Sequence, residues 1–139
     1  MQSKNVLIRQ GGKMGTDQVR FVGAGAAFLL IFLAGFWLSR SGKPYGGLML
    51  NVHKLVSVGV VVLLVITIRR ASQAAALGAM ELTAVVLTGL FFLGTVACGG
   101  LLAIGKPLPA IVHRLHQITP YLTVLATAAT LYLLQGRTV

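Results

Sequence analysis

Four long apolar runs, separated by short polar or glycine-rich links, dominate the pattern of hydrophobic and polar positions in this chain. The runs cover about residues 21–38, 48–68, 77–104 and 108–134. A helix that crosses the hydrocarbon core of a bilayer needs about 20 predominantly apolar residues. Each run is close to that length or longer, and none has a charged residue near its middle. The pattern therefore predicts four transmembrane helices.

The links between these runs contain residues that end helices. Residues 39–47 include three glycines and a proline, residues 69–76 form a second link, and Gly105-Lys106-Pro107 separates the last two runs. Links this short make successive helices antiparallel neighbours. We therefore expect an all-α integral membrane protein, folded as an up-down-up-down four-helix transmembrane bundle.

This bundle accounts for residues 21–135. Residues 1–20 form a basic polar N-terminal segment that we expect on the membrane surface, and residues 136–139 form a short C-terminal tail. The N-terminal segment has the charge of a signal peptide, but the apolar run after it is long and lacks a clear small-x-small cleavage site. We therefore interpret the first apolar run as a retained span.

Composition identifies the main partner as the lipid bilayer. Of the 139 residues, 56% are hydrophobic and only 10% are charged, whereas soluble domains carry about 25% charged residues. The net charge of +10 would suggest nucleic acid in a soluble protein. Here the basic residues cluster at the ends of the apolar runs, without interleaved aromatic residues, and we expect no nucleic-acid binding. The single cysteine, Cys98, excludes an intrachain disulfide, and the absence of Cys-x-x-Cys-His excludes covalently attached c-type haem.

The three histidines are the candidate functional residues. His53 lies in the first third of the second run, and His113 and His116 lie in the first third of the fourth run. These two runs point in the same direction, so the histidines share a depth near the end opposite the termini. Polar groups in the hydrocarbon region are costly and usually face the interior of a bundle.

The bundle geometry leaves room for a flat cofactor between these histidines. Neighbouring helices lie about 10 Å apart, so the second and fourth lie about 14 Å apart across the diagonal. Imidazoles that reach inward could bind a haem iron from both sides. The first and third helices carry glycines near this depth, which permit close approach of the backbone to a ligand. These glycines are Gly35, Gly94, Gly99 and Gly100.

The two halves of the chain also show a weak repeat. The segment Val52-His53-Lys54-Leu55-Val56 aligns with Leu115-His116-Gln117-Ile118-Thr119. Gly35 precedes His53 by 18 residues, and Gly99 precedes His116 by 17. The repeat suggests a duplicated pair of helices in which each half supplies one ligand.

With these features the chain resembles the small four-helix membrane cytochromes b, which hold haem between transmembrane histidines and exchange electrons with quinones or ascorbate. The resemblance implies one non-covalent haem b, since members with two haems need four histidine ligands. His53 is then one ligand, and the repeat favours His116 as the other. His113 would bond a propionate or a quinol, although the roles of His113 and His116 could be reversed. Lys54 and Arg114 could neutralise propionates or simply extend to lipid headgroups.

Two other functions compete with this interpretation. A small four-helix transporter would need a carboxylate deep in the membrane, and Glu81 lies too near a helix start for that role. A cofactor-free accessory or scaffold subunit of a larger membrane complex would use the histidines as interhelical hydrogen-bond donors. If haem is bound, quinol and a redox protein at the outer face are the expected partners, in a homo-oligomer or a larger complex. Composition does not separate a passive electron relay from a quinol-linked oxidoreductase.

The distribution of basic residues predicts that both termini lie in the cytoplasm of a bacterial or archaeal cell. Cytoplasmic ends of membrane helices carry an excess of Lys and Arg. Seven basic residues lie on the side of the termini: Lys4, Arg9, Lys13, Arg20, Arg69, Arg70 and Arg137. Five lie on the other side: Arg40, Lys43, Lys54, Lys106 and Arg114. Reporter domains fused after Val139 should be active when the reporter requires the cytoplasm, and activity only outside it would refute this orientation.

Overall fold

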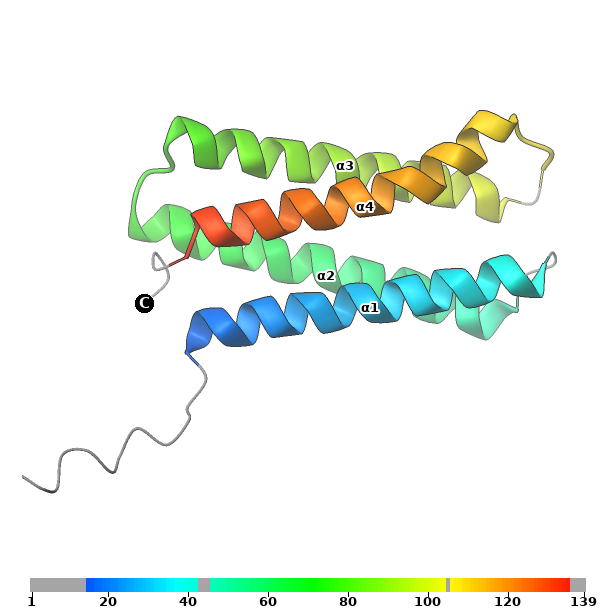
Figure 1. The fold of residues 1–139 in the computed structure, drawn as a ribbon, viewed down its shortest axis with the longest axis horizontal. Coiled ribbons are helices and arrows are strands. Elements are labelled where there is room, and N and C mark those ends of the chain that lie inside the picture. Colours follow the sequence, from blue (N-terminus) through cyan, green and yellow to red (C-terminus); the bar gives the residue numbers. More distant parts are fainter. Residues whose placement is uncertain (1–14, 43–45, 105, 136–139) are drawn as a thin grey trace, which may run out of the picture.

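The computed structural model describes residues 15–42, 46–104 and 106–135, and this part of the chain forms four helices. They are α1 (Thr16–Ser41), α2 (Gly47–Ala74), α3 (Ala79–Ala103) and α4 (Ala110–Leu133). Successive helices run antiparallel, and the start of α1 lies at the same end of the bundle as the end of α4 (Figure 1). The expected all-α up-down-up-down bundle is therefore confirmed.

Two of the helices extend beyond the predicted spans. Helix α1 begins at Thr16, within the segment expected to lie on the membrane surface, and the Gln18 side chain accepts a hydrogen bond from the Gly15 N–H at 3.2 Å. Helix α2 continues to Ala74, through most of the predicted second link. Alanine, arginine and glutamine favour helix, and an arginine side chain can reach water from a helix end. The expectations for residues 1–14, for Lys43 and for residues 136–139 lie outside the described residues.

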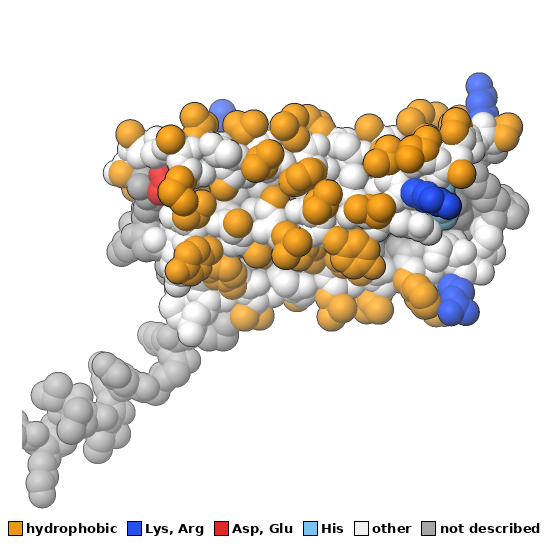
Figure 2. Space-filling view, turned by 45° about the horizontal axis from the view of Figure 1, so that its top comes forward, with side chains coloured by type: hydrophobic (Ala, Val, Ile, Leu, Met, Phe, Trp, Pro, Cys, Tyr) orange, Lys and Arg blue, Asp and Glu red, His pale blue; other side chains and the backbone are white. Residues whose placement is uncertain are grey.

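Three of the helices are long and apolar enough to cross a membrane: α1 from Gln18, α2 and α3. Helix α4 does not meet the same criterion, because its first half contains Arg114 and Gln117 as well as two histidines. It nevertheless packs along α3 (Figure 1). Apolar side chains cover the bundle surface, whereas Lys and Arg gather near its ends (Figure 2). The chain is thus an integral membrane protein with lipid-facing helices, and a fourth membrane span remains a prediction.

The bundle is built from two helical hairpins. Helix α1 packs along α2, α3 packs more extensively along α4, and a smaller contact between α1 and α4 joins the hairpins. A hydrophobic core contributed by all four helices also joins them: Phe28, Val60, Leu64, Phe92 and Leu131. The rings of Phe28 and Phe92 stack with centroids 6.1 Å apart. This core lies between the histidines and the end of the bundle that holds the termini.

Hydroxyl groups line the interface between α3 and α4. The Thr88 and Thr130 hydroxyls are hydrogen-bonded at 2.9 Å, and those of Thr95 and Thr123 at 3.2 Å. Thr88, Thr123 and Thr130 are buried. Interhelical hydrogen bonds stabilise membrane helix pairs by about 0.6 kcal/mol each. This polar interface makes α3 and α4 the more firmly joined hairpin.

We predict a measurable coupling between Thr88 and Thr130. Thr88→Val and Thr130→Val should each lower the free energy of unfolding in mixed micelles, because each leaves a buried hydroxyl without its partner. The double variant should lose less than the sum of the two, with a coupling of about 0.6 kcal/mol. Thr83→Val is the control, since that hydroxyl bonds the Ala79 carbonyl of its own helix at 2.8 Å. Strictly additive losses would show that the pair is not coupled.

Candidate histidine site

His53 is fixed to the neighbouring helix by a hydrogen bond to the backbone. Its half-buried ring lies on α2, and its Nδ1 is 3.1 Å from the carbonyl oxygen of Ile31 in α1. A carbonyl can only accept a hydrogen bond, so Nδ1 carries the proton and donates it. In the neutral imidazole the other nitrogen, Nε2, then keeps a free lone pair. Nε2 is therefore the nitrogen of His53 that could bind a metal or accept a hydrogen bond.

His116 has the same arrangement in the second hairpin. Its half-buried ring lies on α4, and its Nδ1 is 3.2 Å from the carbonyl oxygen of Thr95 in α3. The same argument places the proton on Nδ1 and the free lone pair on Nε2. Each hairpin therefore holds one histidine in the same tautomer, through a backbone carbonyl of its preceding helix.

A glycine lies one helical turn beyond each of these carbonyls. A Cβ atom at Gly35 would lie 3.3 Å from Cε1 of His53, and a Cβ atom at Gly99 would lie 2.8 Å from Cε1 of His116. Both distances are shorter than normal contacts, and the second could not exist without movement of the ring. Gly99 is therefore needed to let the His116 imidazole lie against the facing backbone, and Gly35 leaves room for the close approach of His53.

The two histidine rings are anchored to separate hairpins, His53 to α1 and His116 to α3. The backbones of α2 and α4 make less contact than those of α1 and α4.

The other predicted site residues are exposed or have open space beside their Cα atoms. His113, Lys54 and Arg114 are exposed at the same end of the bundle, and Figure 2 shows a histidine beside a basic side chain there. Added Cβ atoms at Gly94 and Gly100 would meet no atom within 4 Å. Of the four glycines expected to make room for a cofactor, Gly35 and Gly99 instead face an imidazole.

Sequence analysis missed the two acceptor carbonyls, Ile31 and Thr95. Backbone carbonyls carry no residue-type signal, so side-chain chemistry could not identify them. The sequence spacing could have identified them, because each acceptor residue lies four residues before the glycine that faces the histidine. In a helix this spacing places both groups on one face.

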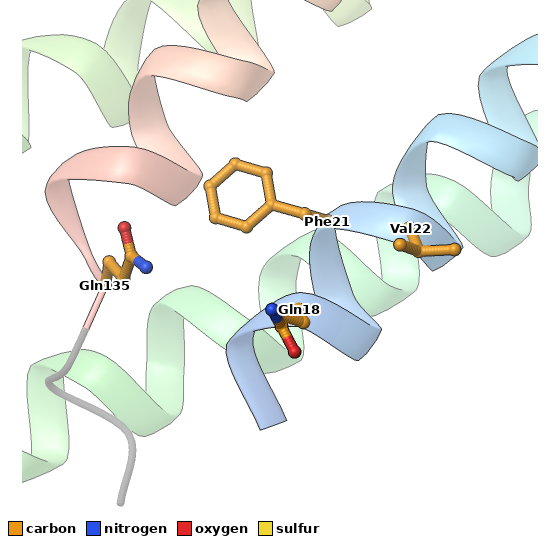
Figure 3. Close-up of a pocket in the computed structure, with 4 residues that line it drawn as sticks. All are labelled: Gln18, Phe21, Val22 and Gln135. Carbon is orange, nitrogen blue, oxygen red and sulfur yellow. The ribbon is translucent and has the colours of Figure 1, made fainter. Parts of the chain in front are cut away.

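No group of three or more His, Cys, Asp or Glu side chains in the described part of the chain could hold a metal ion. A hollow of about 440 Å³ at the opposite end of the bundle is lined by Gln18, Phe21, Val22 and Gln135 (Figure 3). The described residues that line it include no histidine, cysteine or charged side chain. The histidine pair is therefore the feature of the described structure with the chemistry of a functional site.

Comparisons with protein-family models, curated proteins and solved structures find no match for this chain. The resemblance to small four-helix membrane cytochromes b therefore remains a prediction. Function is inferred below from the geometry of the histidines.

We predict that Gly99 tolerates substitution less well than Gly100. Gly99→Ala should push the His116 ring away and weaken its bond to Thr95, with a loss of about 1–3 kcal/mol in the free energy of unfolding. Gly100→Ala is the control, because it adds the same methyl group in open space and gains the same helix propensity. Unfolding in mixed micelles and the ring C–H resonances of ¹³C-labelled histidine provide the measurements. Equal behaviour of the two variants would contradict the contact.

Proposed function

We propose that this chain is a membrane b-type cytochrome that carries electrons through one haem held between His53 and His116. The observation that supports the proposal is the matched pair of Nδ1–H···O=C hydrogen bonds, which leaves the Nε2 lone pair of each histidine free. Histidines that bind metals usually donate their other N–H to a carbonyl or carboxylate. Such a bond fixes the ring and raises the basicity of the ligating nitrogen.

The donor set fits haem better than a metal ion held by protein alone. Haem iron takes four nitrogens from the porphyrin and needs only two axial ligands from the protein. The described residues supply two half-buried imidazoles, one on each hairpin, and no cluster of three metal-ligating side chains. When bound, haem supplies one-electron iron chemistry, and the protein supplies ligation, a low-dielectric surrounding and orientation.

The residues around the pair have secondary roles in this proposal. Lys54 and Arg114 are exposed at the histidine-bearing end and would neutralise haem propionates. His113 lies one turn before His116 and is exposed, whereas His116 is the ring held by a backbone carbonyl. His113 would therefore bond a propionate or a quinol and would not hold the iron. A quinol in the bilayer and a redox protein at the outer face are the proposed partners, in a bacterial or archaeal inner membrane.

The cofactor-free scaffold is the second candidate function. One observation favours it, because the same two hydrogen bonds also join the helices of each hairpin. A purely structural role accounts for Nδ1 but gives no role to either Nε2. Haem ligation gives a role to both nitrogens of each ring. We therefore prefer the cytochrome.

Single histidine variants test the proposal through the reduced-minus-oxidised visible spectrum. Protein purified from haem-replete cells should show a low-spin b-type spectrum with about one haem per chain. His53→Ala should abolish it, because α2 has no other histidine, and His116→Ala should nearly do so. His113→Ala should retain the low-spin bands and change only the midpoint potential or quinol reactivity.

Several outcomes would contradict this assignment. A colourless preparation would remove the proposed function and favour the scaffold. Loss of haem in His113→Ala with retention in His116→Ala would reverse the two roles in α4. If all three variants keep the low-spin spectrum, haem is not held between α2 and α4. Far-ultraviolet circular dichroism of each variant checks that the helices persist.

A further inference from the structure

Pro120 divides α4 into two halves that differ in packing. The buried residues of α4 and its C-cap all follow this proline: Thr123, Thr127, Thr130, Leu131 and Leu134. From Ala110 to Thr119, in contrast, each residue is exposed or half-buried. The threonine interface with α3 therefore holds the half after Pro120, and the half that carries His113 and His116 lies outside it.

The proline interrupts the helix directly after the histidine-bearing half. Proline has no N–H, so the carbonyl of His116, four residues before Pro120, loses its regular helical donor. Helices bend at such points, and α4 changes direction near its middle (Figure 1). In the first hairpin the residue four after His53 is Ser57, which keeps its N–H and whose hydroxyl also donates to the His53 carbonyl at 2.7 Å. The backbone after the histidine is thus reinforced in α2 and weakened in α4.

The facing helix is also less covered in the second hairpin. In α1, Ala34 and Leu38 lie one residue before and three residues after the glycine that faces the histidine, and both are buried. In α3, Cys98 and Leu102 hold the same positions around the corresponding glycine, and both are half-buried. The side chains of α3 at the histidine-bearing end are therefore packed less closely than those of α1.

A single hydrogen bond joins the described residues from Ala110 to Thr119 to another helix. It is the bond from His116 Nδ1 to the carbonyl oxygen of Thr95, at 3.2 Å. Ala110 lies ten residues before Pro120, which is about 15 Å along a helix. A rotation of about 20° at the proline would therefore move the start of α4 by roughly 5 Å.

We propose that the segment Ala110–Thr119 is a flap that hinges at Pro120, and that the hydrogen bond from His116 to Thr95 holds it closed. Opening moves the His116 ring away from α3 and makes room between the hairpins at this end of the bundle. Haem enters by this opening, and its bond to Nε2 then favours the closed flap, because a ligand shifts an equilibrium toward the state that it binds better. The entry of haem rests on the proposed function, whereas the hinge itself does not.

Distances between pairs of nitroxide labels in lipid nanodiscs measure the flap. In a Cys98→Ser background, the flap pair joins Ile111→Cys on α4 to Leu101→Cys on α3, both exposed positions. The control pair joins Leu125→Cys to Leu93→Cys, exposed positions on the same two helices beside the threonine interface. In haem-free protein the flap pair should show a second population about 5 Å longer than the first, and the control pair should show a single narrow distance.

Substitutions at the hinge and at the hydrogen bond change the two populations in opposite directions. Pro120→Ser copies Ser57 into the second hairpin and restores the N–H, so it should reduce the longer population by about two- to tenfold. His116→Ala removes the bond to Thr95 and should increase that population by a similar factor. His113→Ala is the control, because this exposed ring on the same flap does not make the bond, and it should leave the distances unchanged.

Addition of ferric protoporphyrin IX tests the role of the flap in cofactor entry. In the unmodified protein it should convert the flap pair to the shorter distance and leave the control pair unchanged. Flap distances that do not change in protein that has bound the haem would overturn this role. Failure of the protein to bind haem at all is a different result, which refutes the proposed function and leaves the hinge to be judged from the haem-free distances.

Three outcomes would overturn the hinge. The first is a single narrow distance for the flap pair in both the unmodified protein and His116→Ala. The second is a longer population that persists undiminished in Pro120→Ser. The third is a control pair as broad as the flap pair, which would show that the whole hairpin moves and that the motion does not begin at Pro120.

Discussion

The hydrogen bond from each histidine to a backbone carbonyl of the preceding helix is the interaction on which the rest of the site depends. The carbonyls of Ile31 and Thr95 each accept from Nδ1 of a histidine. In a regular helix the same carbonyls also accept from the N–H four residues later, which belongs to Gly35 or Gly99. A second donor can approach such a carbonyl only where the next turn leaves space. Glycine provides that space, so carbonyl, glycine and histidine form one unit that sets the register of each hairpin.

The same unit is built into two hairpins of different character. In the second hairpin the acceptor residue is Thr95, whose hydroxyl bonds that of Thr123, and these belong to a wider threonine interface. In the first hairpin the counterparts are Ile31 and Val60, which pack without hydroxyl groups. Helices α3 and α4 accordingly contact each other more extensively than α1 and α2. One histidine is thus held by a polar, firmly packed hairpin, and the other by an apolar hairpin with less contact.

The distribution of charge distinguishes the two ends of the bundle. The acidic residues, Asp17 and Glu81, both fall at the start of helices on the side of the termini. The described charged residues at the histidine-bearing end are all basic and exposed: Arg40, Lys54, Lys106 and Arg114. Such an end attracts anionic groups, whether lipid phosphates or carboxylates. The hydrophobic core lies nearer the end that holds the termini, so the histidine-bearing end carries most of the polar side chains of the candidate site.

The sequence by itself determined the membrane class, the four helices and their antiparallel order, and it singled out His53 and His116 as candidates. These features follow from the length of the apolar runs, the short links and the cost of placing imidazole in hydrocarbon. It did not determine the helix ends, because Gln18 and Arg70 extend helices past the apolar runs. Only the tertiary structure showed that Gly99 supports His116 while the adjacent Gly100 faces open space. That difference, like the choice of Ile31 and Thr95 as acceptors, depends on how each helix is rotated against its neighbour. The identity of a single residue does not show this rotation, because the packing of the whole hairpin sets it.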